Sequence, residues 1–254
     1  MPRQRVGRTR AQRLLVVVSA LVLIAGACSA NEDSATELNE AASVVQTVTV
    51  PPSPDSVADS IVRILGFGCG SPALGSGFAV AEHLIVTSGH LVTGRDPETL
   101  GVKRPNGNEY SATLIAFDEH LDLALLQVDG TSFAPVELIQ EIPESAGVGI
   151  GLRTEVDGQY VNEVDFEVDR VVTVNWDGVF RNTESSFHGV QLNADISRGD
   201  SGTALFVNEN QVLGLIHSTS RAGLDRGYAV SSIQIAEFLD EEAASGEVVA
   251  PRCA

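Results

Sequence analysis

Short runs in which apolar and polar residues alternate follow one another over most of the chain. The first half contains GSGFAVAE (75–82), HLIVTS (83–88), EYSATLIAFD (109–118) and LDLALLQVD (121–129), with turn residues such as PNGN (105–108) between them. The second half repeats the pattern in QYVNEVDFEVDRVVTVNW (159–176), GVQLNADI (189–196), QVLGLIHS (211–218) and GYAVS (227–231). Because a period of two broken by Gly, Asn and Pro is typical of antiparallel sheet, the sequence predicts an all-β fold in two segments.

A helical period follows the last of these runs. In SSIQIAEFLDEEAA (231–244) the apolar residues Ile233, Ile235, Ala236 and Leu239 recur at a spacing that suits an amphipathic helix. The sequence therefore predicts a short C-terminal helix.

The first 27 residues have the pattern of an export signal. An apolar run of about a dozen residues, LLVVVSALVLIA, is too short for a comfortable membrane span. It is preceded by Arg3, Arg5, Arg8, Arg10 and Arg13. Residues 28–55 mix small, acidic and proline residues without a sustained period, which predicts a flexible linker before a globular part at 56–254.

The charge of the chain is strongly negative, with 34 acidic and 16 basic residues and a formal net charge of −18. Without residues 1–27, 11 basic residues remain against 34 acidic ones, a formal charge of −23. Such a surface repels nucleic acid and anionic lipid and favours cationic partners. The same acidity also serves solubility, so it names no substrate.

The stretch RGDSGTALF (198–206) places Ser201 between two glycines, an arrangement that packing alone does not require. Gly199 and Gly202 allow a tight turn that leaves the amides of Gly199 and Ser201 free to bind an oxyanion. A serine nucleophile needs a histidine as its base and a carboxylate to orient the histidine.

Candidates for both partners lie upstream of the serine. His90 ends the apolar run LIVTSGH, and Asp122 opens the run DLALLQV. The order His90, Asp122, Ser201 differs from the order Ser, Asp, His of α/β-hydrolases, and Thr203 stands where their G-x-S-x-G motif has its last glycine. The sequence therefore excludes that class.

Three of these motifs, in this order, resemble a known family. TSGHLV (87–92), DLALLQV (122–128) and RGDSGTAL (198–205), with GSGFAV (75–80) before them and RGYAV (226–230) after, are similar to the trypsin-like serine proteases of the chymotrypsin fold, in particular to the bacterial HtrA-like group. The resemblance covers about residues 56–239. Too few residues follow for the PDZ domain that HtrA proteases usually append, so none is expected.

The resemblance implies two packed six-stranded antiparallel β-barrels, at 56–140 and 141–230, followed by the helix and a tail at 231–254. It implies a serine endopeptidase with catalytic residues His90, Asp122 and Ser201 and an oxyanion hole at Gly199 and Ser201. Its substrates are proteins or peptides, and it uses no metal and no other cofactor.

Two other functions share the same motifs. One is a catalytically silent protease fold that acts as a binding or chaperone-like module of the cell envelope. Its support comes from two departures from the family pattern, Thr203 after GDSG and TSGH in place of TNAH or TAAH. The other is an esterase that uses the same triad.

Activation and specificity are less closely defined by the motifs. Trypsin-type activation inserts a new N-terminal Ile-Val-Gly-Gly beside the acid before the serine, but here Arg63 follows Ile61 and Val62. Asp200 therefore needs another partner, for which Arg198 or Arg181 is the candidate.

Four further residues are candidates for substrate binding. Asp195 lies six residues before Ser201, at the position that forms the floor of the S1 pocket in trypsin-like enzymes. An aspartate there selects substrates with Arg or Lys at P1, whereas the HtrA pattern favours small apolar residues at P1. His217 lies one residue later than the histidine of the Gly-Ile-His motif of glutamyl endopeptidases, and this shift turns its side chain to the other face of a strand. His217, Ser218 and Thr219 are therefore predicted to pair with an extended substrate backbone.

The three cysteines fit an exported protein. Cys28 follows the apolar run in AGACS, where both ordinary processing and a lipobox would cut before it. Lipidation of Cys28 would leave Cys69 and Cys253 to form a disulfide, a pairing that a cysteine at a similar place in related periplasmic proteases supports. The alternatives are an unmodified Cys28 and two free thiols. The predicted location is the cell envelope, as a lipoprotein on the outer face of the membrane, or the secreted fraction.

Overall fold

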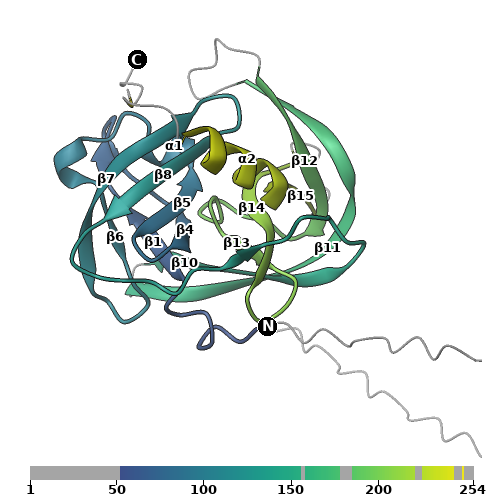
Figure 1. The fold of residues 1–254 in the computed structure, drawn as a ribbon, viewed down its shortest axis with the longest axis horizontal. Coiled ribbons are helices and arrows are strands. Elements are labelled where there is room, and N and C mark those ends of the chain that lie inside the picture. The colour runs from purple at the N-terminus through teal and green to yellow at the C-terminus, as the bar shows by residue number, and fades with distance from the viewer. Residues whose placement is uncertain (1–51, 156–157, 178–184, 221–224, 243–247, 249–254) are drawn as a thin grey trace, which may run out of the picture. The chain divides into compact units, whose positions relative to one another are not determined.

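The computed structural model describes residues 52–155, 158–177, 185–220, 225–242 and 248. The described part consists of two β-barrels with short helical segments (Figure 1). The predictions for residues 1–51, for Arg181 and for Cys253 concern residues outside the described part of the chain.

The first barrel is a closed ring of six antiparallel strands. In ring order these are β1 (Ile61–Leu65), β4 (Ser76–Ala81), β5 (Leu84–Ser88), β8 (Leu123–Val128), β7 (Glu109–Asp118) and β6 (Gly101–Lys103). The connections contain a small hairpin of β2 (Phe67–Gly68) and β3 (Ser71–Pro72), the helical turn α1 (Gly89–Val92) and the 3-10 turn η1 (Pro97–Thr99).

The second sheet also closes into a ring of six strands, because β13 pairs with β14 as well as with β10. In order these are β13 (Ala204–Phe206), β10 (Ala146–Glu155), β11 (Gly158–Trp176), β12 (Ser185–Ala194), β15 (Arg226–Ser231) and β14 (Gln211–Thr219). A seventh strand, β9 (Glu137–Leu138), adds a parallel pairing to β14. The helix α2 (Ser232–Glu242) contacts β9, β14 and β15. The predicted two six-stranded barrels with a short C-terminal helix are confirmed.

The alternating pattern explains why these segments form two-faced strands. In β11, Val164 and Phe166 are buried, whereas Glu163, Asp165 and Glu167 on either side of them are exposed. Since successive side chains of a strand point to opposite faces, one register buries both apolar residues of this segment. Beyond the register shift between Val168 and Arg170, Val171 is 60% exposed.

The core is continuous between the two barrels. Its first cluster contains Phe78 and Val86 of the first barrel together with Ile150 and Phe206 of the second. Each barrel also has an interior cluster of its own. The two lobes are therefore packed together by apolar side chains, and the residues at their junction hold fixed positions.

Ser76, at the start of β4, joins three parts of the fold. Its amide donates to the carbonyl oxygen of Ser201 (2.9 Å), and its hydroxyl oxygen accepts a hydrogen bond from the amide of Leu152 in β10 (2.8 Å). The hydroxyl of Thr87 in β5 donates to the carbonyl oxygen of Ser76 (2.6 Å). One buried serine therefore connects the first barrel to the second and to the loop that carries Ser201.

Replacement of Ser76 by Ala removes the acceptor of the Leu152 amide and leaves this buried N–H without its partner. Because an unsatisfied buried donor costs roughly 1–3 kcal/mol, we expect the free energy of unfolding in urea to fall by about that amount. Ser88→Ala is the matched control, since Ser88 is equally buried and its hydroxyl has no partner among the described residues. The control should keep or raise the stability, and equal losses in the two variants would contradict this role of Ser76.

Candidate active site

Asp122 is held at the start of β8 by a tight turn. The Oδ1 atom of Asp118 accepts hydrogen bonds from the amides of His120 (2.7 Å) and Leu121 (3.0 Å), which fixes the backbone before it. Asp122 itself has φ +54°, a left-handed conformation that is uncommon for a residue with a side chain. Its side chain has no solvent exposure. A strained residue whose carboxylate is fully buried is a feature of functional sites.

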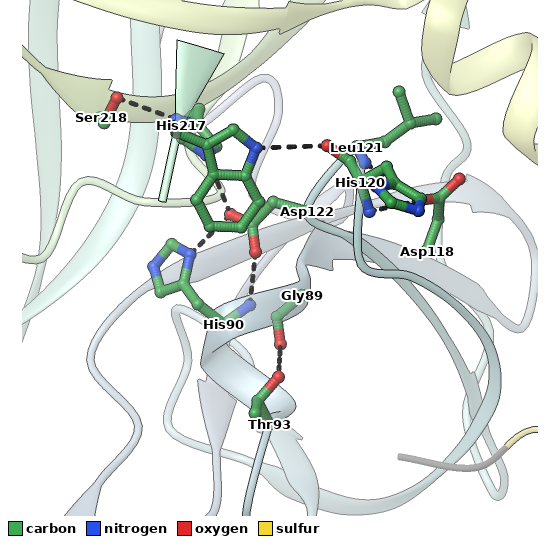
Figure 2. A network of polar contacts seen from close by, with 10 residues as sticks. Gly89, His90, Thr93, Asp118, His120, Leu121, Asp122, His217 and Ser218 are labelled. Atoms are coloured by element: carbon green, nitrogen blue, oxygen red, sulfur yellow. Dashed lines mark hydrogen bonds and ion pairs between the residues drawn. The ribbon is translucent and has the colours of Figure 1, made fainter. Parts of the chain in front are cut away.

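His90 lies on α1 and contacts Asp122 through two of its nitrogens (Figure 2). Its backbone amide donates to Asp122 Oδ1 (2.7 Å), and its ring Nδ1 lies 2.7 Å from Asp122 Oδ2. With the Nδ1 proton donated to the carboxylate, the Nε2 lone pair is free to accept a proton. Thr93 stabilises the short helix by donating its hydroxyl to the carbonyl oxygen of Gly89 (2.9 Å).

The charge of Asp122 also governs the protonation of His90. Desolvation lowers the pKa of His90, but attraction by the Asp122 carboxylate and the hydrogen bond to it outweigh this effect, so the pKa lies above the ordinary 6.5. The side chain of His90 remains 35% exposed, which leaves its ring accessible.

His217 approaches the same carboxylate from the second barrel. It is the extra residue of a β-bulge, because Ile216 and Ser218 pair with consecutive residues of β15. Its Nε2 lies 3.4 Å from Asp122 Oδ2, and its Nδ1 lies 2.8 Å from the hydroxyl of Ser218 (Figure 2). The ring packs edge-on against Trp176. Its side chain therefore lies beside the same carboxylate oxygen as His90, with the two ring centroids 6.4 Å apart.

Burial determines the charge of His217. It lowers the pKa from 6.5 to about 4, an effect larger than the opposing attraction of Asp122. A neutral ring with its proton on Nε2 faces Asp122 with a donor and accepts a hydrogen bond from Ser218. Sequence reasoning missed this contact, although a lone histidine in the apolar run QVLGLIHS indicated a buried polar group that needs a partner.

The loop around Ser201 depends on glycine at two positions. Gly199 has φ +103° and Gly202 has φ +78°, both in the left-handed region. A side chain at Gly202 would also lie 2.0 Å from the carbonyl oxygen of Ser76. The amide of Gly202 donates to the carbonyl oxygen of Ile216 (2.8 Å), which fixes the loop next to His217.

The amides of Gly199 and Ser201 donate no hydrogen bond within the described part of the chain. Two such donors in one tight turn provide a place for an oxyanion. Within the same residues, no hydrogen bond joins the hydroxyl of Ser201 to His90. Such bonds are often long before substrate binds.

Thr203, which departs from the family pattern, fits because two facing residues lack side chains. A Cβ at Gly149 would lie 3.2 Å from Cγ2 of Thr203, and one at Gly151 would lie 2.4 Å from its Oγ1. The larger residue after GDSG is thus compensated by glycines of β10, and the Ser201 loop keeps its backbone path.

Asp200 is paired with Arg153 of β10. The Arg153 guanidinium donates to both carboxylate oxygens, with Nε at 2.7 Å from Oδ1 and a second, shorter contact from Nη2 to Oδ2. Asn162 donates to Oδ1 (3.0 Å) and the Ser197 amide to Oδ2 (2.9 Å). The predicted partner Arg198 is wrong, because β10 already places Arg153 beside this carboxylate, which has no solvent exposure.

The substrate-binding candidates do not share one site. His217, Ser218 and Thr219 line a hollow of about 970 Å³ together with residues of β11, β12 and β15, among them Trp176. Asp195 is exposed and lines a different hollow of about 310 Å³ with Arg153. The structure therefore does not bring Asp195 together with the other three residues.

Two further candidates concern the cysteines and the membrane. Cys69 is disulfide-bonded, and the pairing with Cys253 stays a prediction because Cys253 lies outside the described residues. Cys28 lies outside them as well. Among the described residues, no helix has the length and the apolar character to span a bilayer.

Two six-stranded barrels, with a histidine paired to a buried aspartate and a glycine-flanked serine at their junction, define a protein of the chymotrypsin-like fold. The trypsin-like peptidase domain family matches residues 75–215, more than half of the chain. The chain therefore belongs to this family.

Its relatives are serine proteases of the HtrA type and a mycobacterial serine protease. Serine protease HTRA1 of Xenopus tropicalis is 30% identical over 177 residues, which cover 66% of this chain and 36% of the relative. Serine protease Rv3671c of Mycobacterium tuberculosis is 22% identical over 193 residues, which cover 76% of this chain and 48% of the relative. The crystal structure of the active form of Rv3671c protease matches the fold with a TM-score of 0.69 at 20% identity, over 80% of this chain and 93% of that one. The chain spans between about a third and a half of the length of these curated relatives.

Replacement of Arg153 by Met leaves the buried Asp200 carboxylate without its cation. Because an unpaired buried charge costs about 3–5 kcal/mol, we expect a loss of this size in urea unfolding. Addition of Asp200→Asn removes the charge and should recover part of the loss. Lys103→Met is the control, since its ion pair with Glu109 is solvent-exposed and should contribute less than about 1 kcal/mol. A loss in the Arg153 variant no larger than in the control would contradict the role of the Arg153–Asp200 pair.

Replacement of His217 by Gln tests its neutral, buried state. The unfolded chain takes up a proton near pH 6.5 that the folded ring accepts only near pH 4, so stability falls as the pH drops through this window. The contribution is up to about 1.4 kcal/mol per pH unit. His90 is present in both proteins, so its own titration largely cancels when the two pH profiles are compared. Urea midpoints measured between pH 6.5 and 5 should therefore decline less steeply in His217→Gln than in the wild type, and identical slopes would show that His217 is not the titrating group.

Proposed function

We propose that the chain is a serine endopeptidase in which Ser201 is the nucleophile, His90 the general base and Asp122 the residue that orients His90. The observation that carries the proposal is the doubly hydrogen-bonded contact of His90 with the fully buried Asp122. Packing alone gives no reason for a charged group in this place, whereas acyl transfer by a serine requires it. Membership in the trypsin-like peptidase domain family supports the same assignment.

The reaction proceeds by two acyl transfers. Ser201 Oγ attacks the carbonyl carbon of a peptide bond while His90 Nε2 takes the hydroxyl proton. The amides of Gly199 and Ser201 stabilise the oxyanion of the tetrahedral intermediate, and Asp122 stabilises the imidazolium. His90 then gives its proton to the leaving amine, and water releases the acyl group by the reverse sequence of steps.

Proteins and peptides in extended conformation are the proposed substrates. Beyond Leu215, which pairs with Ala204 of β13, no described strand continues on this side of β14. The edge at His217–Thr219 therefore has backbone groups available for a substrate strand, next to the hollow of about 970 Å³. Asp195 lies in another hollow, so this geometry does not support its role in selecting basic residues.

The proposed location is outside the cytoplasmic membrane. Residues 1–27 act as the export signal, Cys28 is the lipidation site of an envelope lipoprotein, and Cys69 pairs with Cys253. The motifs of the sequence and the disulfide of Cys69 support this proposal.

Labelling of the purified protein with a fluorophosphonate tests the nucleophile and its base together. The wild type should be labelled covalently at Ser201, Ser201→Ala should not, and Asp122→Asn should lose at least about 10³-fold in rate because His90 adopts the wrong tautomer. The labelling rate should rise with pH through an apparent pKa above 6.5, since only neutral His90 acts as a base. Binding of unfolded proteins without any labelling across this range would instead favour the catalytically silent binding module, and ester turnover without peptide cleavage would favour an esterase.

A further inference from the structure

A small basic hollow lies directly beside the Ser201 loop. It has a volume of about 180 Å³, and nine residues line it, among them Arg63, Arg153, Arg198, Leu74, Gly75 and Gly199. Three arginines thus line a space large enough for one side chain, in a chain whose net charge is −18. A local excess of positive charge against this background is unusual and points to an anionic ligand.

The three arginines differ in their partners. The charge of Arg153 is compensated by its contacts with Asp200. The guanidinium groups of Arg63 and Arg198 make no hydrogen bond and no ion pair in the described part of the chain. The acid whose charge acts on Arg63, Glu109, is itself bound to Lys103 at 2.8 Å. Two guanidinium groups are therefore available for a ligand.

The hollow approaches Ser201 at two of its lining residues, Gly75 and Gly199. A Cβ at Gly75 would lie 2.6 Å from the carbonyl oxygen of Ser201, so Gly75 lines the hollow in direct contact with the nucleophile's own backbone. Gly199 carries one of the two proposed oxyanion amides. Because the hollow shares no residue with the one along His217–Thr219, the two hollows are separate sites near the Ser201 loop.

We propose that this hollow is a subsite for a carboxylate on the leaving-group side of the cleaved bond, bound by Arg63 and Arg198. The inference rests on the proposed peptidase function, in which the acyl part of the substrate lies along His217–Thr219. The leaving part then extends past Ser201 towards Gly75 and the arginines. Guanidinium groups bind carboxylates through two parallel hydrogen bonds, and Leu74, 41% exposed, offers an apolar lip for the methylene groups of a glutamate. An acidic side chain and the C-terminus of the substrate both supply this chemistry.

Quenched fluorescent peptides distinguish an acidic side chain from a C-terminal carboxylate as the group that is bound. A sequence that the protein cleaves is first found by mapping the products from casein, and each of the three positions after the cut is then varied between Glu and Gln. A second pair ends after these positions with a free carboxylate or with an amide. We expect kcat/KM at least about tenfold higher for the acidic member of one pair, which corresponds to one charge-assisted bidentate contact. The pair that responds identifies a side chain or a C-terminus as the ligand.

Variants of the two arginines test the assignment. Arg63→Gln and Arg198→Gln should each reduce the acid-to-amide ratio, and the double variant should bring it close to one. Arg226→Gln is the matched control, because Arg226 is an exposed arginine that lines neither this hollow nor the one along His217–Thr219, and its loss should leave the ratio unchanged. Fluorophosphonate labelling of each variant verifies that the site is folded.

Two negative results of these assays would lead to different conclusions. If all peptides of a pair are cleaved equally fast by the wild type, the carboxylate subsite is wrong while the peptidase function stands. If no peptide and no protein is cleaved and no labelling occurs, the peptidase function itself is overturned, and the subsite with it. A ratio that falls equally in Arg226→Gln would assign the preference to overall charge and would also overturn the subsite.

Discussion

A buried carboxylate must be paired, and this constraint shapes both sides of the active site. Asp122 and Asp200 have no solvent exposure, so each ionised group needs hydrogen bonds that replace water. Asp122 obtains them from the amide and ring of His90 and faces His217 as well. Asp200 obtains them from Arg153, Asn162 and the Ser197 amide. The partners of Asp122 come from α1 and β14, and those of Asp200 come from β10, β11 and the loop after β12, so both barrels contribute to the site.

Arg153 occupies the place beside Asp200 that a new N-terminus takes when a trypsin-type zymogen is cleaved. In trypsin-type zymogens the partner of this acid is a newly cut N-terminus, which inserts beside it. Here the partner is an internal side chain of β10, fixed by the pairing of β10 with β11 and β13. Asp200 is therefore already paired in this structure without a newly cut N-terminus.

The sequence predicted the features that depend on local pattern. Alternation over runs such as 109–118 and 159–176 predicted strands, and the motifs around His90 and Asp122 predicted two residues that the structure brings into contact. The partner of Asp200 was missed, because Arg153 is 47 residues away and only the register of β10 places it there. The position of His217 was missed for a similar reason, since a bulge between Ile216 and Ser218 decides where the ring lies and leaves no mark in the alternation. Both misses are non-local contacts that hydrophobic periodicity does not encode.

The net charge of the chain is negative, whereas the hollow lined by Arg63 and Arg198 is locally positive, so the two favour substrates of opposite charge. The net charge of −18 attracts cations from afar, yet this long-range field is screened within about 10 Å at moderate salt. A carboxylate bound by Arg63 and Arg198 would be in direct contact with them, so salt would weaken this interaction less than it weakens the long-range field. The overall charge would then govern the encounter with a substrate, whereas the proposed subsite would select a carboxylate after the cleaved bond, and the two preferences need not agree. A substrate with basic residues along most of its length and one carboxylate just after the cut would satisfy both.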